Sequence, residues 1–101
     1  MITVEQLLMT AREEGASDVH ITVGVPPRMR VNGRIANLDY PSLSETDCSK
    51  IIYSIMDDRQ MELFRDNKQI EFALSVPKAG RYRVSAFMQK GLPASAIRLV
   101  T

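Results

Sequence analysis

Two arginines in the last quarter of the chain have the spacing to bind an anion together. If Lys90 and Gly91 are the two residues of a tight turn, the strands before and after that turn place Arg83 directly opposite Arg98. Like charges at opposite positions on paired strands repel each other by some tenths of a kcal/mol up to about 1 kcal/mol. A bound anion offsets this repulsion, because guanidinium groups present planar donors that suit phosphate. The pair therefore predicts an anion-binding site.

Two other interpretations of this pair stay open. The two side chains could splay apart into water, or a three-residue loop could shift the register by one and separate them. The two-residue turn nevertheless gives a coherent pattern, in which one face is apolar and the other carries Arg81, Arg83 and Arg98. The apolar face consists of Tyr82, Val84, Ala86, Met88, Ile97 and Leu99.

The charges are unevenly distributed along the chain. Residues 76–101 hold five basic residues and no acidic one, whereas residues 39–71 hold four basic and eight acidic residues. The whole chain has a net charge of +1, so its overall balance indicates no partner. The local distribution predicts that the C-terminal part faces an anion and that the middle forms a different surface. A solvated strand face with chance clustering is the alternative.

The remaining polar residues form no catalytic motif. The sequence has no G-x-x-x-x-G-K-[ST] loop, and its one histidine, His20, is far in sequence from its one cysteine, Cys48. Neither a catalytic triad nor a metal site is predicted from this set. We expect His20 to be a surface or capping residue and Asp18 to close the turn before it. Arg28 and Arg30 lie on one face of a hairpin and are expected to be solvated.

The first half of the chain contains signals for a helix, a strand and a hairpin. Thr3 and Gln6 have the spacing of a capping box, and apolar residues recur at helical spacing until Gly15, which favours a helix end. The alternation across Val19–Val23 predicts a half-buried strand. Asn32-Gly33 predicts a tight hairpin, because both residues tolerate the positive φ that such a turn needs.

The second half repeats this mixture of helix and strand. Ser44 with Asp47 predicts the start of a helix, and Asp57 or Asp58 is expected to cap a second, shorter one. A strand begins at Ile70. Turns at residues 77–80 and 90–91 then separate three strands, the last of which runs over residues 94–100.

Length and composition bound the class of protein. A chain of 101 residues with 45% apolar and 25% charged residues is expected to form one soluble domain over residues 1–101. Its apolar runs are too short to cross a bilayer, and its N-terminus has no secretory signal. A single cysteine excludes an internal disulfide and fits a reducing, cytoplasmic setting. The abrupt end at Thr101 suggests a cut at the edge of a domain.

Several short segments resemble the bacterial type II and type IV secretion and pilus motor ATPases. The first is Gly15-Ala16-Ser17-Asp18-Val19-His20-Ile21, which is similar to the GASDxHI signature of that family. The other matching segments are Pro26-Pro27, Arg30-Val31-Asn32-Gly33, Leu38-Asp39-Tyr40-Pro41, Gly80-Arg81-Tyr82-Arg83-Val84-Ser85 and Ala96-Ile97-Arg98-Leu99. The resemblance covers essentially the whole chain. It is greatest to the N-terminal domain of the pilus retraction ATPases.

The resemblance implies an α+β, PAS-like fold, in which helices pack on one side of an antiparallel sheet. In that family this domain precedes a RecA-like ATPase domain that carries the P-loop, so the chain alone is not expected to hydrolyse ATP. ATP and magnesium are expected only in the full-length protein. The family forms hexamers, so the expected partners are the chain's own C-terminal ATPase domain and that of a neighbouring subunit in a homohexamer.

The resemblance also implies roles for three arginines. In the family, ATP lies between the two domains of a subunit, and the arginines that reach its phosphates fall on Arg83 and Arg98 here, with Arg81 as a third contact. These side chains would couple ATP hydrolysis to domain motion during pilus retraction, which drives twitching motility. The assembled machine would lie in the cytoplasm, at the inner face of the cytoplasmic membrane, against the pilus platform protein of that membrane.

Other functions are weaker or stay open. No nucleic acid partner is expected, because Tyr82 falls on the apolar face and leaves a base-stacking platform incomplete. No insertion into the membrane is expected either. A free-standing PAS-like module that binds an anionic small molecule, or that dimerises as an adaptor, is the alternative from a different class. The sequence does not separate a retraction motor from an accessory or assembly motor.

Overall fold

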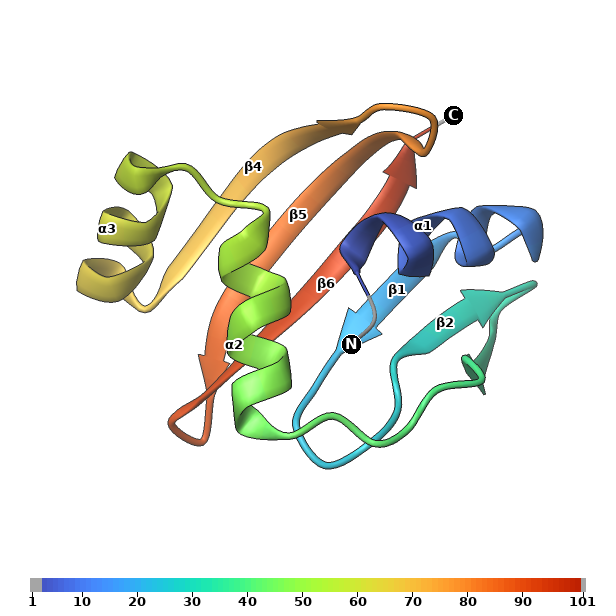
Figure 1. Ribbon diagram of the computed structural model, residues 1–101, viewed down its shortest axis with the longest axis horizontal. Helices are drawn as coiled ribbons and strands as arrows, with labels where there is room; N and C mark the ends of the chain where they lie inside the picture. Colours follow the sequence, from blue (N-terminus) through green and yellow to red (C-terminus); the bar gives the residue numbers. More distant parts are fainter. Residues whose placement is uncertain (1–2, 101) are drawn as a thin grey trace.

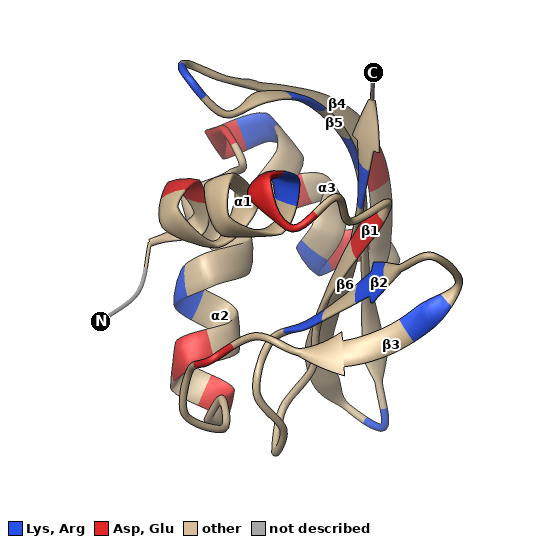
Figure 2. Ribbon diagram, turned by 90° about the vertical axis from the view of Figure 1, so that its right-hand side faces the viewer, with Lys and Arg blue, Asp and Glu red and all other residues tan. Residues whose placement is uncertain are grey.

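A computed structural model describes residues 3–100, which form one six-stranded antiparallel sheet and three helices (Figure 1). The strands lie in the order β3-β2-β1-β6-β5-β4. Along the chain the elements are α1 (Val4–Glu13), β1 (Asp18–Ile21), β2 (Arg28–Val31), β3 (Arg34–Asn37), α2 (Glu45–Ser54), α3 (Asp58–Asn67), β4 (Gln69–Val76), β5 (Gly80–Gln89) and β6 (Leu92–Val100). All three helices lie on one side of the sheet, which confirms the predicted α+β architecture (Figure 2).

Each helix begins at a capping box, formed by two residues three positions apart. A side-chain oxygen of each residue accepts a hydrogen bond from the backbone amide of the other. The pairs are Thr3 with Gln6 at α1, Ser44 with Asp47 at α2 and Asp57 with Gln60 at α3. Of the two aspartates predicted for the third cap, Asp57 makes it and Asp58 is the first helical residue. At α2, the hydrogen bonds from Ser44 hold the pKa of Asp47 below its usual range. These bonds satisfy amides that the helix itself leaves free.

Both predicted two-residue turns are present. Asn32-Gly33 have φ angles of 51° and 80°, and Lys90-Gly91 have φ angles of 52° and 78°. Positive φ at both central residues matches the twist of the strands on either side. The second turn fixes the register of β5 against β6, so Arg83 lies directly opposite Arg98 as predicted. The alternative with a three-residue loop at this position is wrong.

Two strand boundaries differ from the prediction by two residues. The strand expected over Val19–Val23 is shorter, since β1 ends at Ile21. The chain turns there because Gly24 has a φ of 93° and its amide donates to the carbonyl oxygen of Leu43 at 2.8 Å. In contrast, β6 begins at Leu92, two residues earlier than expected, because the tight turn lets pairing start at once.

The core lies between the helices and the sheet. Its largest fully buried side chains are Tyr82, Phe64, Leu7, Leu8, Ile21, Ile52, Ile97, Val19 and Val84. Cys48 of α2 belongs to this core, and burial raises the pKa of its thiol to about 11, so the thiol is protonated at neutral pH. None of the helices within residues 3–100 combines the length and the apolar character needed to span a membrane.

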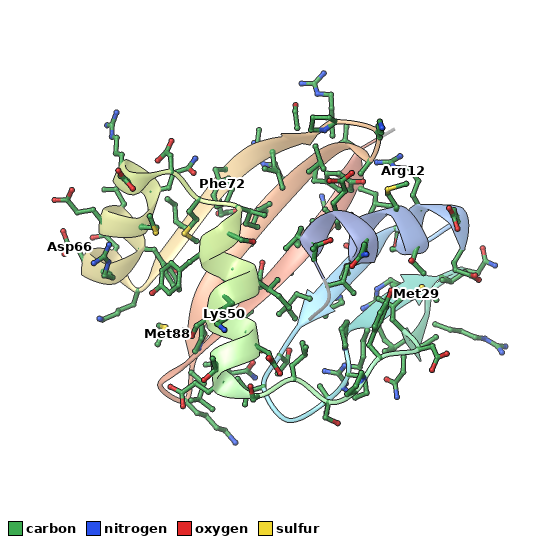
Figure 3. All side chains as sticks on the ribbon, viewed as in Figure 1. Arg12, Met29, Lys50, Asp66, Phe72 and Met88 are labelled. Carbon is green, nitrogen blue, oxygen red and sulfur yellow. The ribbon has the colours of Figure 1, made fainter. Side chains whose placement is uncertain are left out.

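Arg12 connects α1 to the turn between β4 and β5 through its guanidinium group. It extends from α1 toward the end of the sheet where that turn lies (Figure 3). Its Nε donates to the carbonyl oxygen of Ala79 at 2.8 Å, and its guanidinium carbon lies 5.1 Å from the centre of the Tyr82 ring. The Tyr82 hydroxyl donates to the same carbonyl. Gly80 has a φ of 100°, and a Cβ there would lie 2.7 Å from Arg12 Nη2.

Alanine at Gly80 should therefore destabilise the domain more than alanine at Gly24. Both glycines have a positive φ, so both substitutions strain the backbone by about 1–3 kcal/mol. A Cβ at Gly24 has no atom within 4 Å, whereas one at Gly80 must push Arg12 away from Ala79. Loss of that hydrogen bond adds about 1 kcal/mol. Urea unfolding of the two variants measures the difference.

An Arg12→Ala background tests whether the contact with Arg12 causes the additional loss of stability at Gly80. With the guanidinium absent, the alanine variants at Gly80 and Gly24 should lose equal amounts of stability. A larger loss at Gly80 that persists without Arg12 would contradict the contact described above.

Candidate functional site

The face of the sheet that the helices leave uncovered carries five arginines. On β5 and β6, buried Val84 and Ile97 alternate with exposed Arg83 and Arg98, so the arginines point away from the helices. Residues directly opposite each other on paired strands share a face. By this register the arginines of the uncovered face are Arg28 and Arg30 on β2, Arg81 and Arg83 on β5, and Arg98 on β6.

Arg83 and Arg98 border a shallow depression of about 180 Å³, here called the arginine hollow. Its lining residues are Asp18, Glu71, Arg83, Ser85, Ala96 and Arg98. Ser85 and Ala96 are also directly opposite each other, and their small side chains leave space beside the two guanidinium groups. In the part of the chain that the structure describes, neither guanidinium forms an ion pair. Both are free to bind a ligand.

Two carboxylates also line the arginine hollow. Asp18 lies directly opposite Arg98 across the β1–β6 pair, and Glu71 comes from β4. Asp18 contacts the preceding turn, where it is predicted to act, and it also lies close to an arginine of β2. Its Oδ2 accepts a hydrogen bond from the Ser17 hydroxyl at 2.7 Å and lies 3.7 Å from Nε of Arg30. Arg30 is therefore not merely solvated either, because it offsets the charge of Asp18.

Arg81 is on the same face but outside the arginine hollow. It lies two residues before Arg83 on β5, opposite Val100 at the end of β6. The structure thus brings together two of the three arginines predicted to act on phosphate. The third, Arg81, lies two residues away along β5 and does not line the arginine hollow.

His20 is more enclosed than the predicted surface or capping residue. It lies opposite Arg28 on β2 and opposite Ala96 on β6. Its Nε2 and the Nε of Arg28 are both buried, and neither has a hydrogen-bond partner among the described residues. His20 is thus packed between neighbouring strands, and it does not line the arginine hollow.

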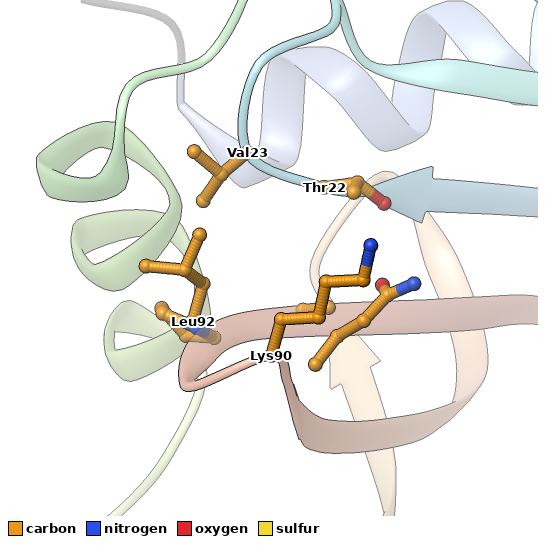
Figure 4. Close-up of a pocket in the computed structure, with 7 residues that line it drawn as sticks. Thr22, Val23, Lys90 and Leu92 are labelled. Atoms are coloured by element: carbon orange, nitrogen blue, oxygen red, sulfur yellow. The ribbon is translucent and has the colours of Figure 1, made fainter.

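A second hollow, of about 220 Å³, lies at the other end of β6, beside the β5–β6 turn (Figure 4). Lys90 is its one charged lining residue, and its side chain extends toward Thr22 (Figure 4). This hollow holds no acid, thiol or imidazole that could act as a base or nucleophile. Over residues 3–100, no three His, Cys, Asp or Glu side chains gather as a metal site.

Known proteins resemble this chain in both sequence and fold, although no protein-family model matches it. The type IV pilus ATPase PilU of Pseudomonas aeruginosa is 38% identical over 95% of the chain. The type IV pilus retraction ATPase PilT of the same organism is 33% identical over 96% of it. A crystal structure of the pilus retraction motor PilT with bound ADP covers the whole chain with a TM-score of 0.93 at 35% identity. The chain is homologous to the N-terminal domain of PilT-like ATPases.

This PilT-like domain spans about a quarter of the length of the curated relatives that it matches. It covers 25% of PilU, 28% of PilT and 30% of the PilT chain solved with ADP. Within that part, the agreement in fold extends over the whole sheet and its helices. The fold expected from the motif resemblance is therefore confirmed.

Proposed function

We propose that this PilT-like domain is the N-terminal domain of a type IV pilus retraction motor, in which Arg83 and Arg98 contact the phosphates of ATP. The observation that carries this proposal is the position of two guanidinium groups directly opposite each other on the uncovered face of the sheet. Neither is engaged in an ion pair with another described residue. The solved PilT relative contains ADP, which supports a nucleotide as the anion.

The residues of the arginine hollow fit a phosphate chain. Each guanidinium presents several N–H donors in one plane, which matches the geometry of phosphate oxygens. Negative charge between Arg83 and Arg98 also relieves the repulsion that their opposite positions create. Bound ATP would supply the negative charge to which the arginines respond, and its cleavage, with magnesium, would take place on a separate ATPase domain.

The arginines would convert a change in charge into a change in domain position. ATP carries more negative charge than ADP, so Arg83 and Arg98 hold the phosphates of ATP more strongly. Their hold weakens once the third phosphate has been released. The sheet fixes both side chains relative to the core, so the domain follows them as a rigid body. The domain would close on the ATPase domain before hydrolysis and open after it.

The proposed assembly explains why one face of the sheet is uncovered and basic. The uncovered face would pack on the domain's own ATPase domain, and other surfaces would contact the ATPase domain of a neighbouring subunit in a homohexamer. Such a motor would work in the cytoplasm, at the inner face of the membrane that holds the pilus platform protein.

The codons that follow Thr101 test this proposal directly. We expect the reading frame to continue into a second domain with a G-x-x-x-x-G-K-[ST] loop. A stop codon at this point in the gene would contradict the motor and favour the free-standing adaptor.

Calorimetric titration of residues 1–101 with ATP tests the division of roles. No tight binding is expected, because most contacts to ATP belong to the other domain, and tight binding by this chain alone would contradict that division.

A further inference from the structure

Glu71 is the carboxylate of the arginine hollow that no described residue neutralises. The hollow is lined by two basic and two acidic side chains. Asp18 is offset by Arg30, whose Nε lies 3.7 Å from its Oδ2. Glu71 forms no such ion pair with any residue between 3 and 100. Its negative charge therefore acts on whatever lies between Arg83 and Arg98.

The sheet register places Glu71 near Arg83. Glu71 lies directly opposite Ser85 across the β4–β5 pair, and Arg83 is two residues before Ser85 on the same face. Diagonal positions of this kind lie roughly 7–8 Å apart at the backbone, within reach of two long side chains. Glu71 is exposed, and β4 is the last strand of the sheet, so the carboxylate is not part of the core.

We propose that Glu71 sets the affinity of the Arg83–Arg98 pair for phosphate by opposing the bound anion, a role that rests on the function proposed above. A phosphate held by both guanidinium groups lies above Ser85 and Ala96, beside the Glu71 carboxylate. The two negative groups repel each other, and this repulsion cancels part of the attraction to the arginines. Once the phosphate leaves, Arg83 has a carboxylate within reach as a partner. Glu71 therefore favours release.

The test is the binding of inorganic tripolyphosphate to the 101-residue chain at low ionic strength, followed by amide shifts in NMR titrations. We expect Glu71→Gln to bind about fivefold more tightly than the wild-type chain, which is the scale of one charge pair at a protein surface. The gain should shrink as salt is added, because ions screen the repulsion. Glu71→Asp keeps the charge and should bind within about twofold of the wild type.

Glu62→Gln is the matched control for this experiment. It makes the same change in net charge at an exposed position of α3, on the helix side of the sheet, and should bind like the wild-type chain. If Glu71 only supported the structure of the site, Glu71→Gln would bind tripolyphosphate more weakly than the wild-type chain. The proposed repulsion predicts the opposite, a gain in affinity.

The outcomes separate this inference from the proposed function. Unchanged or weaker binding in Glu71→Gln, an equal gain in Glu62→Gln, or no detectable binding by either the wild-type chain or Glu71→Gln would overturn the role of Glu71. The proposed function fails on a different observation, which is normal ATP turnover of the full-length protein after alanine substitution of Arg83 and of Arg98.

Discussion

Alanine at Arg83 or at Arg98 should lower the ATP turnover of the full-length protein by about a hundredfold. Each change removes a charged planar donor from the phosphates and leaves the strand backbone in place. The two guanidinium groups face each other across one ladder and act on the same anion. The double variant should therefore lose little more than either single variant. Phosphate release at saturating ATP measures the turnover.

Three controls separate a lost phosphate contact from a lost fold. Arg34→Ala changes an exposed arginine of β3 outside the arginine hollow and should leave turnover unchanged. Arg83→Lys keeps the charge but not the planar donors, so it should retain only part of the activity. Both alanine variants should be as stable as the wild type or more stable by up to about 1 kcal/mol, because a like-charge pair is relieved. Normal turnover in both alanine variants would remove these arginines from the mechanism.

The parts of this site that the sequence predicts correctly depend on residues close together in the chain. The Lys90-Gly91 turn requires only two residues with positive φ, and the register of the strands on either side then follows from counting. The position of Arg83 opposite Arg98 needs no further information. The helix starts are similar, because each capping box joins residues three positions apart.

The carboxylates of the arginine hollow depend on strand pairings that no two-residue turn specifies. Asp18 meets Arg98 only because β1 pairs with β6, and these two strands come from opposite ends of the chain. Alternation along β1 predicts which face Asp18 occupies, but not which strand lies beside it. Glu71 enters through the register of β4 against β5, which follows a loop longer than the two-residue turns. The contact of Arg12 with the β4–β5 turn joins residues far apart in the sequence, so no short motif predicts it.

Phe64→Ala should remove about 3–5 kcal/mol of stability, a large part of the roughly 5–15 kcal/mol that a domain of this kind has. Phe64 is the one buried residue of α3 and is 1% exposed. Its ring meets that of Tyr53 in α2 edge-on, with the ring centres 5.9 Å apart. Truncation leaves a cavity between the two helices that their backbones cannot readily close. Urea unfolding of the variant and the wild type measures the loss.

Leu63→Ala is the control for this change, because it alters the neighbouring residue of the same helix. Leu63 is 39% exposed, so its truncation should cost less than about 1 kcal/mol, and equal losses at the two positions would contradict the anchoring role of Phe64.

The loss of stability in Phe64→Ala should also be local. Helix α3 leads into β4 through Lys68, whose carbonyl oxygen accepts a hydrogen bond from the Met88 amide at 3.2 Å. Amide exchange should therefore accelerate in α3 and β4 before β1 and β6, because the strands at the centre of the sheet keep both neighbours.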